Sequence, residues 1–311
     1  MDISMLENFL SASVRMATPL LIASLGMLIS ERAGLVNIGA EGIMLFASFA
    51  GYAGAKLSGN YWIGLIWGIG TGLILAYAFA LATIHFKAKQ IIIGAALNIF
   101  CAGASSFLYR LVFYGTDRLD KGIAAQTFPS LPIPFLSRIP LLGHMIFDHN
   151  ILVYFSFAMV ALLWFTMKKT SLGLRIIAVG DHPSAADSLG VSVVLVCYWA
   201  VLFSGAMMGI AGTFLSIAQA SSFGENMVSG KGFIAMAVVI LGKWSPLGVL
   251  GGALLFGGAN ALQMLVQLSG ITIPRNIIMM VPYVMTVVAV LAVSRFKVGA
   301  PRALGIPYEK Q

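Results

Sequence analysis

The chain has 311 residues, of which 59% are hydrophobic and only 10% are charged, and its mean hydropathy is +0.94. Soluble domains carry roughly 25% charged residues, so this composition excludes a chain whose whole surface faces water and predicts one that faces lipid. The formal net charge is +8, but the basic residues stand singly or in small groups between apolar runs. That distribution excludes a nucleic-acid-binding patch and is typical of short loops on the inner side of a membrane.

Long apolar runs follow one another along the chain. A helix that crosses the hydrocarbon core needs about 20 mostly apolar residues. The runs cover residues 12–30, 35–55, 61–84, 90–114, 151–167, 196–217, 233–242, 246–267 and 277–294. We therefore expect an all-α polytopic membrane protein with about nine transmembrane helices in two pseudo-symmetric halves, forming a single domain over residues 1–311. The seventh run is too short to cross alone and predicts a half-helix or a span entered through glycine-rich chain.

The loops between the runs predict the orientation in the membrane. Residues 1–8 contain two acids and no basic residue, which is unlike a secretory signal, so the first run is expected to stay in the protein. Three basic groups belong together on the cytoplasmic side by the positive-inside rule: Lys87 and Lys89; Lys168, Lys169 and Arg175; and Arg295, Lys297 and Arg302. This puts the N-terminus and the segment 115–149 outside, and the loop 168–195 in the cytoplasm, although three basic residues in 115–149 oppose the bias.

Glycine-rich segments interrupt the apolar pattern in both halves, at residues 31–42 and 223–233. Unwound backbone is tolerated in a membrane only where it is buried in protein or lines a wet cavity, so such paired interruptions indicate a substrate pathway. The candidate pathway residues are Asn37, Glu41, Asn98, Phe223, Asn226, Lys231 and Phe233. The alternative is that the glycines only permit close packing and the polar groups lie in interfacial loops, which is the interpretation we favour for Glu31 and Arg32.

Glu41 is the acid that stands out, because it lies inside an apolar run. An acid embedded in a membrane costs roughly 2.5–3.5 kcal/mol on insertion scales, so its carboxylate should face a cavity or a partner such as Lys231. A pathway role and a purely structural pair both stay open, and the same holds for Asn98. Lys231 does not belong to a phosphate-binding loop, because that motif requires Ser or Thr after the lysine and here Gly232 follows.

The sequence offers no group of residues for catalysis or for a metal or other cofactor. Cys101 and Cys197 lie inside apolar runs and are expected to pack as small hydrophobic residues. The four histidines are scattered, without the spacing of metal ligands. An intramembrane enzyme would need His, Asp or Ser residues that converge on one site, and the sequence shows no such set.

A short helix is predicted within the cytoplasmic loop, at residues 180–190. Asp181 can cap it, proline suits its first turn, and glycine can end it. Two turns of helix are not stable alone in water, so this helix docks either on its own chain or in a groove of a partner. Its small residues suit a groove, and Leu189 is the one large apolar side chain available as an anchor. The candidate contact residues are Pro183, Ala185, Ala186, Asp187, Leu189 and Gly190.

Three segments carry a resemblance to a known family. They read SERAGLVNIGAEGIM at 30–44, GDHPSAADSLGVSV at 180–193, and GKGFIAMAVVILGKWSPLGVLGGALLFGGANAL at 230–262. In this order and spacing they resemble the nucleoside and simple-sugar branch of the ABC importer permeases, which is related to the ribose and branched-chain amino acid permeases. The resemblance extends over residues 18–293, except that the segment 115–149 matches nothing in that family.

The resemblance implies the ABC importer permease fold in the cytoplasmic membrane, with a homodimeric or heterodimeric pore. The implied partners are two cytoplasmic ATPase subunits and an external substrate-binding lipoprotein. The helix at 183–190 would be the coupling helix that docks on the ATPase, which favours the partner's groove over the chain's own surface. The subunit would translocate a small polar solute by alternating access, first of all a nucleoside. A simple sugar or riboflavin-like ligand is the alternative, as is a stand-alone secondary transporter, for which Glu41 is nearly the only candidate acid.

Overall fold

The computed structural model describes residues 3–114, 127–132, 148–268 and 299–308, together with isolated positions between 280 and 291. Helices account for most of this part of the chain. In chain order the elements are α1 (Ile3–Arg32), α2 (Ala40–Ser58), α3 (Tyr61–Ala80), η1 (Leu81–His85), α4 (Gln90–Tyr109), η2 (Arg110–Tyr114), β1 (Ser130–Pro132), β2 (Asp148–Asn150), α6 (Ile151–Lys169), α7 (Ser171–Asp181), α8 (Pro183–Ser188), α9 (Val193–Thr213), η4 (Phe214–Gln219), α10 (Lys231–Leu241) and α11 (Pro246–Leu268).

Six helical spans are long and apolar enough to cross a membrane, which confirms a mostly helical polytopic membrane protein. They are Leu6–Arg32, Tyr61–His85, Gln90–Phe113, Ile151–Lys169, Val193–Gln219 and Pro246–Gln267. Each coincides with a predicted apolar run. The second and seventh runs are the helices α2 and α10, which do not belong to these six, and α10 is short, as predicted. The run 277–294 lies outside the described residues, so the predicted count of nine is not confirmed.

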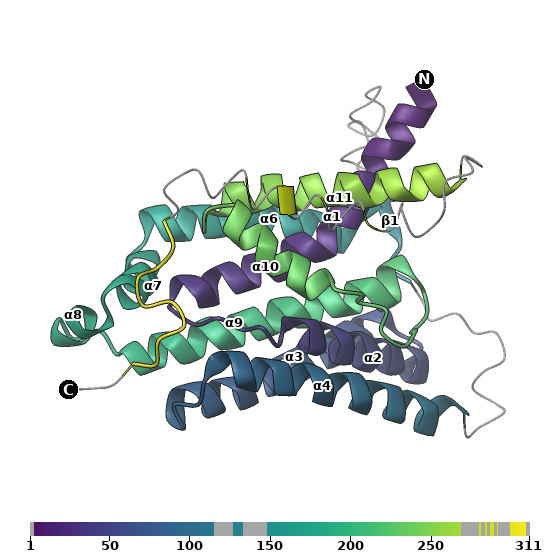
Figure 1. The fold of residues 1–311 in the computed structure, drawn as a ribbon. Coiled ribbons are helices and arrows are strands. Elements are labelled where there is room, and N and C mark those ends of the chain that lie inside the picture. The colour runs from purple at the N-terminus through teal and green to yellow at the C-terminus, as the bar shows by residue number, and fades with distance from the viewer. Residues whose placement is uncertain are drawn as a thin grey trace.

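The described helices lie mostly side by side, with α1 inside the bundle (Figure 1). α1 packs against α6, α9, α10 and α11, whereas α4 contacts α2 and leaves most of its surface open. α7, α8 and the C-terminal segment lie at one end of the helices, and the start of α1 and β1 lie at the other (Figure 1). The structure thus brings the two described groups of basic residues after α6 and η1, and Arg302, toward a common end.

Small residues let the central helices approach closely. Where α3 crosses α9, a Cβ added to Gly72 would lie 2.2 Å from the carbonyl oxygen of Gly205. One turn further along, a Cβ added to Gly209 would lie 2.5 Å from the carbonyl oxygen of Gly68. Such contacts are how membrane helices associate without help from water, because close backbones gain van der Waals contact. Any larger residue at these positions would push the two helices apart.

Local sequence accounts for several helix ends. α2 ends at Gly59, whose φ of 67° suits a residue without a Cβ. Asn60 then begins α3, because its side-chain oxygen accepts a hydrogen bond from the backbone N–H of Trp62 at 2.8 Å. Asn150 begins α6 in the same way, through the N–H of Val153. These caps set the boundaries that the apolar runs had placed within a few residues.

Three features differ from what the sequence predicted. β1 and β2 form a short antiparallel pair, with Leu131 opposite His149, in the segment expected to be an external loop; residues 133–147 lie outside the described part. The loop 168–195 contains the helix α7, which the sequence analysis missed. Asp181 is the last residue of α7 and does not cap α8, whose first turn follows His182 without a side-chain cap.

Candidate functional site

The connection between α1 and α2 is held in place by amide side chains. Gln90, at the start of α4, accepts a hydrogen bond from the backbone N–H of Val36 at 2.8 Å. Asn37 is fully buried, and its oxygen accepts from the N–H of Gly39 at 3.0 Å, just before α2 begins. The predicted interruption at residues 31–42 is therefore an ordered connection in which two backbone N–H groups bond to side-chain oxygens, although the amide nitrogens of Asn37 and Gln90 are buried without a partner.

Asn98 clamps the first turn of α2 from the middle of α4. Its oxygen accepts a hydrogen bond from the N–H of Gly42 at 2.8 Å, and its nitrogen donates to the carbonyl oxygen of Ile38 at 3.0 Å. Gly42 permits this approach, since an added Cβ would lie 2.8 Å from the Cα of Asn98. This amide in the middle of the fourth apolar run thus fixes a helix start, where the orphan N–H groups need partners.

Glu41 joins the two predicted interruptions. Its two carboxylate oxygens accept hydrogen bonds from the backbone N–H groups of Gly230 and Gly232, both at 2.7 Å, at the first turn of α10. Lys231, which the sequence offered as a possible partner, hydrogen-bonds elsewhere: its ammonium donates to the carbonyl oxygen of Val228 at 3.2 Å. The pathway role of Glu41 stays a prediction. Backbone N–H groups at a helix start form a ready-made site for an anion, and the carboxylate occupies it.

An aromatic cluster lies beside this junction. The buried ring of Phe223 contacts the rings of Phe49 and Tyr109, with centroids 5.6 Å and 5.0 Å away. The rings of Tyr52 and Phe113 continue the cluster. Edge-on and tilted contacts of this kind stabilise by about 0.5–1.5 kcal/mol each beyond burial. Phe223 therefore anchors the 220–230 segment to α2 and α4, although the sequence marked it as a pathway residue.

An ion pair ties the same segment to the end of α4. The guanidinium of Arg110 donates to both oxygens of Glu225, at 2.9 Å and 3.2 Å. The hydrogen bond from Arg110 lowers the pKa of the Glu225 carboxyl. Because both side chains are exposed, the pair adds little stability. Asn226 and Phe233 are also exposed, so of the predicted pathway residues these two remain open to solvent or lipid.

A buried cluster at the far end of α1 was missed. Glu31 is 2% exposed and lies in the last turn of α1, so its placement in an interfacial loop is wrong. The indole N–H of Trp244 donates to its carboxylate at 2.6 Å, and Nε of Arg32 donates to the carbonyl oxygen of Trp244 at 2.9 Å. These bonds fasten the turn between α10 and α11 to α1. The sequence did show Glu31 and Arg32 directly after a long apolar run, which could have indicated a buried polar cluster. It gave no indication that Trp244 would be their partner.

Some side chains of α8 and of the residues that follow it are buried against the rest of the chain, and others are exposed. Ala186 is buried against the chain's own core, whereas Ala185 is exposed. Leu189 is 85% exposed, more than any other large apolar side chain described. Pro183 occupies the first turn, and Gly190, with a φ of 82°, ends the helix. The helix therefore docks partly on its own chain and presents its predicted anchor outward.

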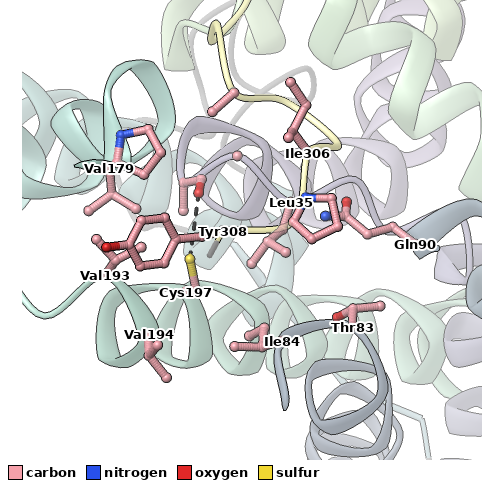
Figure 2. Close-up of a pocket in the computed structure, with 15 residues that line it drawn as sticks. Leu35, Thr83, Ile84, Gln90, Val179, Val193, Val194, Cys197, Ile306 and Tyr308 are labelled. Atoms are coloured by element: carbon pink, nitrogen blue, oxygen red, sulfur yellow. Dashed lines mark hydrogen bonds between the residues drawn. The ribbon is translucent and has the colours of Figure 1, made fainter. Parts of the chain in front are cut away.

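The C-terminal segment fastens this end of the molecule, a contact that the sequence did not reveal. Gly180 accepts a hydrogen bond from the N–H of Ala303, and Gly34 accepts one from Gly305, both at 2.9 Å. Burial and a hydrogen bond with Asp187 raise the pKa of Tyr308. These segments enclose a cavity of about 50 Å³ (Figure 2), which has room for a few water molecules and no solute.

The walls of that cavity include Gln90, Cys197 and Tyr308 (Figure 2). Cys197 is buried, and its thiol lies 3.7 Å from the carbonyl oxygen of Ala33 as a weak donor. Cys101 is buried as well. Among the residues that the structure describes, no three His, Cys, Asp or Glu side chains are grouped so that they could hold a metal ion. The polar groups of the site fix helix ends and bring no reacting groups together.

The fold and the site define a polytopic membrane protein whose two interrupted segments meet inside the helices. Residues 9–290 match the family described as the branched-chain amino acid transport system permease component. The chain belongs to this family, and it is a multi-pass permease subunit of the cell membrane and not an enzyme.

Its relatives cover nearly the same length. The guanosine ABC transporter permease protein NupQ of Bacillus subtilis is 36% identical over 100% of this chain and 99% of its own length. The nucleoside ABC transporter permease protein NupC of Lactococcus lactis is 35% identical over 94% of each chain. A putative glucose ABC transporter permease protein of Haloferax volcanii is 37% identical over 88% of this chain and 82% of its own. No solved structure matches the chain.

Proposed function

We propose that this chain is the permease subunit of an ABC importer that moves nucleosides into the cell by alternating access. The similarity to two permeases named for guanosine and for nucleosides supports the substrate class, because it extends over almost the whole of each chain. The observation that carries the ABC mechanism is the exposed Leu189 on a short helix at the end where the basic loops gather. ATP hydrolysis belongs to a partner, and this chain supplies the path and the contact.

In this proposal α8 is the coupling helix, with Ala185 and Leu189 inserted into a groove of a cytoplasmic ATPase subunit. Burying a leucine gains roughly 1.5–3 kcal/mol, so an anchor left exposed in the isolated subunit favours association. Ala186 and Asp187 instead hold α8 to its own chain, through the core contact and the bond with Tyr308. Because α8 would contact the ATPase on one side and its own chain on the other, a movement of the ATPase would be transmitted to the membrane helices.

The complete transporter contains a second permease subunit, identical or related, and an external substrate-binding lipoprotein. We propose nine spans in two pseudo-symmetric halves, made of the six spans described above together with α2, α10 and the run 277–294. The path then passes the junction of α2 and α10, where Asn226 and Phe233 are open, and Glu41 positions the start of α10. The substrate is held weakly there, because it must leave again.

A simple sugar is the second candidate substrate. It is favoured by one observation, the 37% identity to a relative named as a putative glucose permease. Uptake of labelled guanosine by cells that express the complete transporter distinguishes the two. We expect unlabelled nucleosides to compete with the label and glucose not to compete. Uptake of labelled glucose without uptake of labelled guanosine would move the assignment to sugars.

The coupling role is tested by comparing two leucines at the same end of the molecule. Leu189→Ala removes the proposed anchor on α8, and Leu174→Ala removes a leucine that is 71% exposed on α7. In the reconstituted complex we expect Leu189→Ala to weaken retention of the ATPase by about tenfold, as the loss of a buried side chain implies. It should also lower substrate-stimulated ATP hydrolysis, and Leu174→Ala should change neither. Equal behaviour of the two variants would refute the coupling assignment.

A further inference from the structure

An open apolar groove lies between α6, α7 and α9, and Ile29 of α1 contributes to its lining. Its volume is about 540 Å³, within the roughly 300–1,000 Å³ range of pockets that hold small organic ligands. Apart from Thr166 and Arg175, every side chain that lines it is apolar. The hydroxyl of Thr166 donates to the carbonyl oxygen of Leu162 on its own helix at 2.8 Å. Besides the guanidinium of Arg175, the walls therefore offer an occupant little polar surface, chiefly the indole N–H of Trp199.

This groove is separate from the proposed substrate path. None of the residues around Glu41 lines it, and a nucleoside or sugar would find too few partners there for its several hydroxyl groups. Its rim carries exposed apolar side chains, with Leu195 59% and Trp199 68% exposed. In a chain that crosses a membrane, such a rim faces hydrocarbon. The groove thus suits a long apolar occupant that enters sideways from the bilayer.

One end of the groove is basic. Lys168 and Lys169 stand exposed in the last turn of α6, and Arg175 stands exposed on the helix α7 that follows. Among the described residues Arg175 has no acidic partner, and the only described contact of Lys168 is its position over the ring of Trp164. α7 contributes Leu172, Arg175 and Ile176 to the groove lining, and of these Arg175 is exposed as well as charged. Basic residues beside an intramembrane groove on the cytoplasmic side attract anionic headgroups.

We propose that this groove binds one acyl chain of an anionic phospholipid, whose phosphate pairs with Arg175. Guanidinium and phosphate form bidentate hydrogen bonds. A phosphatidylcholine headgroup also has a phosphate, but its choline cation cancels that charge, so an anionic headgroup is attracted more strongly. The lining also argues against a second copy of the chain as the occupant. A two-fold contact through this face would bring two basic clusters together without an acid in the groove to neutralise them.

Native mass spectrometry of the purified full-length protein tests the proposal, with phosphatidylglycerol and phosphatidylcholine of identical acyl chains as probes. The wild type should retain phosphatidylglycerol in preference to phosphatidylcholine. Arg175→Gln should lower the retention of phosphatidylglycerol about fivefold, the effect expected for one basic residue at the headgroup level. Lys89→Gln, which removes a charge from another loop of the same predicted side, should leave retention unchanged.

A second variant tests the acyl-chain site itself. Val196→Trp fills the groove from α9 and should abolish the retention of both lipids without lowering the heat stability of the protein. Unchanged preference in Arg175→Gln, or an equal loss in Lys89→Gln, would overturn the headgroup assignment. If Val196→Trp kept its lipid but altered the oligomeric state in light scattering, the groove would be a protein interface and the proposal would be wrong.

Discussion

Replacing Glu41 with Gln removes one of the two acceptors that hold the start of α10. The carboxylate accepts hydrogen bonds from Gly230 and Gly232 at 2.7 Å, whereas a glutamine has one oxygen, and its amide nitrogen would face an N–H donor. A hydrogen bond to a charged group contributes about 1.5–3 kcal/mol, and a buried N–H left unsatisfied costs about 1–3 kcal/mol. We expect the free energy of unfolding to fall by about 2–4 kcal/mol and transport to fall with it.

The measurement is the thermal denaturation midpoint of the purified subunit, together with transport by the complete complex well below that midpoint. Lys231→Met is the matched control, because its ammonium bonds to Val228 and not to the carboxylate. It should lower the midpoint much less than Glu41→Gln. If both variants lowered it equally, the ion pair would be the important contact. Unchanged stability and transport in Glu41→Gln would refute the capping role altogether.

Two further predictions concern packing and orientation. Gly232→Ala should destabilise the subunit by about 1–3 kcal/mol, because its Cβ would lie 2.5 Å from the backbone nitrogen of Glu41. Gly251→Ala in α11, where an added Cβ meets nothing, should leave the denaturation midpoint unchanged or raise it. In a variant without the native cysteines, a cysteine at Ser130 should react with an impermeant thiol reagent in intact cells, and one at Ser184 should not. The reverse labelling pattern would contradict the positive-inside orientation.

The membrane helices were predictable because hydrocarbon imposes a simple rule on the sequence. Every backbone group must be paired inside the helix, so a run of about 20 apolar residues has one regular solution. The run 61–84 accordingly became α3 with η1, and the run 246–267 became α11, each within a residue. The short seventh run became α10, again as expected. The length and position of the apolar runs were therefore enough to predict these helices.

The partners of the polar residues were not predictable in the same way. Glu41 binds backbone N–H groups 189 and 191 positions away, and backbone donors leave no mark in a sequence. The sequence offered Lys231 as a partner because it is the one basic side chain in the interrupted segment 223–233. Trp244 and Glu31 are 213 positions apart and meet through a turn between two helices. Only the packing of α1 against α10 and α11 decides such contacts.

The helix α8 and the Glu41 junction are parts of one hydrogen-bonded structure. α8 follows α7, whose Gly180 is bonded to the C-terminal segment, and that segment is bonded in turn to Gly34. Gly34 opens the buried connection to α2, and the first turn of α2 carries Glu41 against α10. Gly180 also lies against the backbone of Arg32, where an added Cβ would fall 2.0 Å from its carbonyl oxygen. A movement of α7 and α8 relative to α1 must therefore either break these bonds or shift the start of α2, and with it the start of α10.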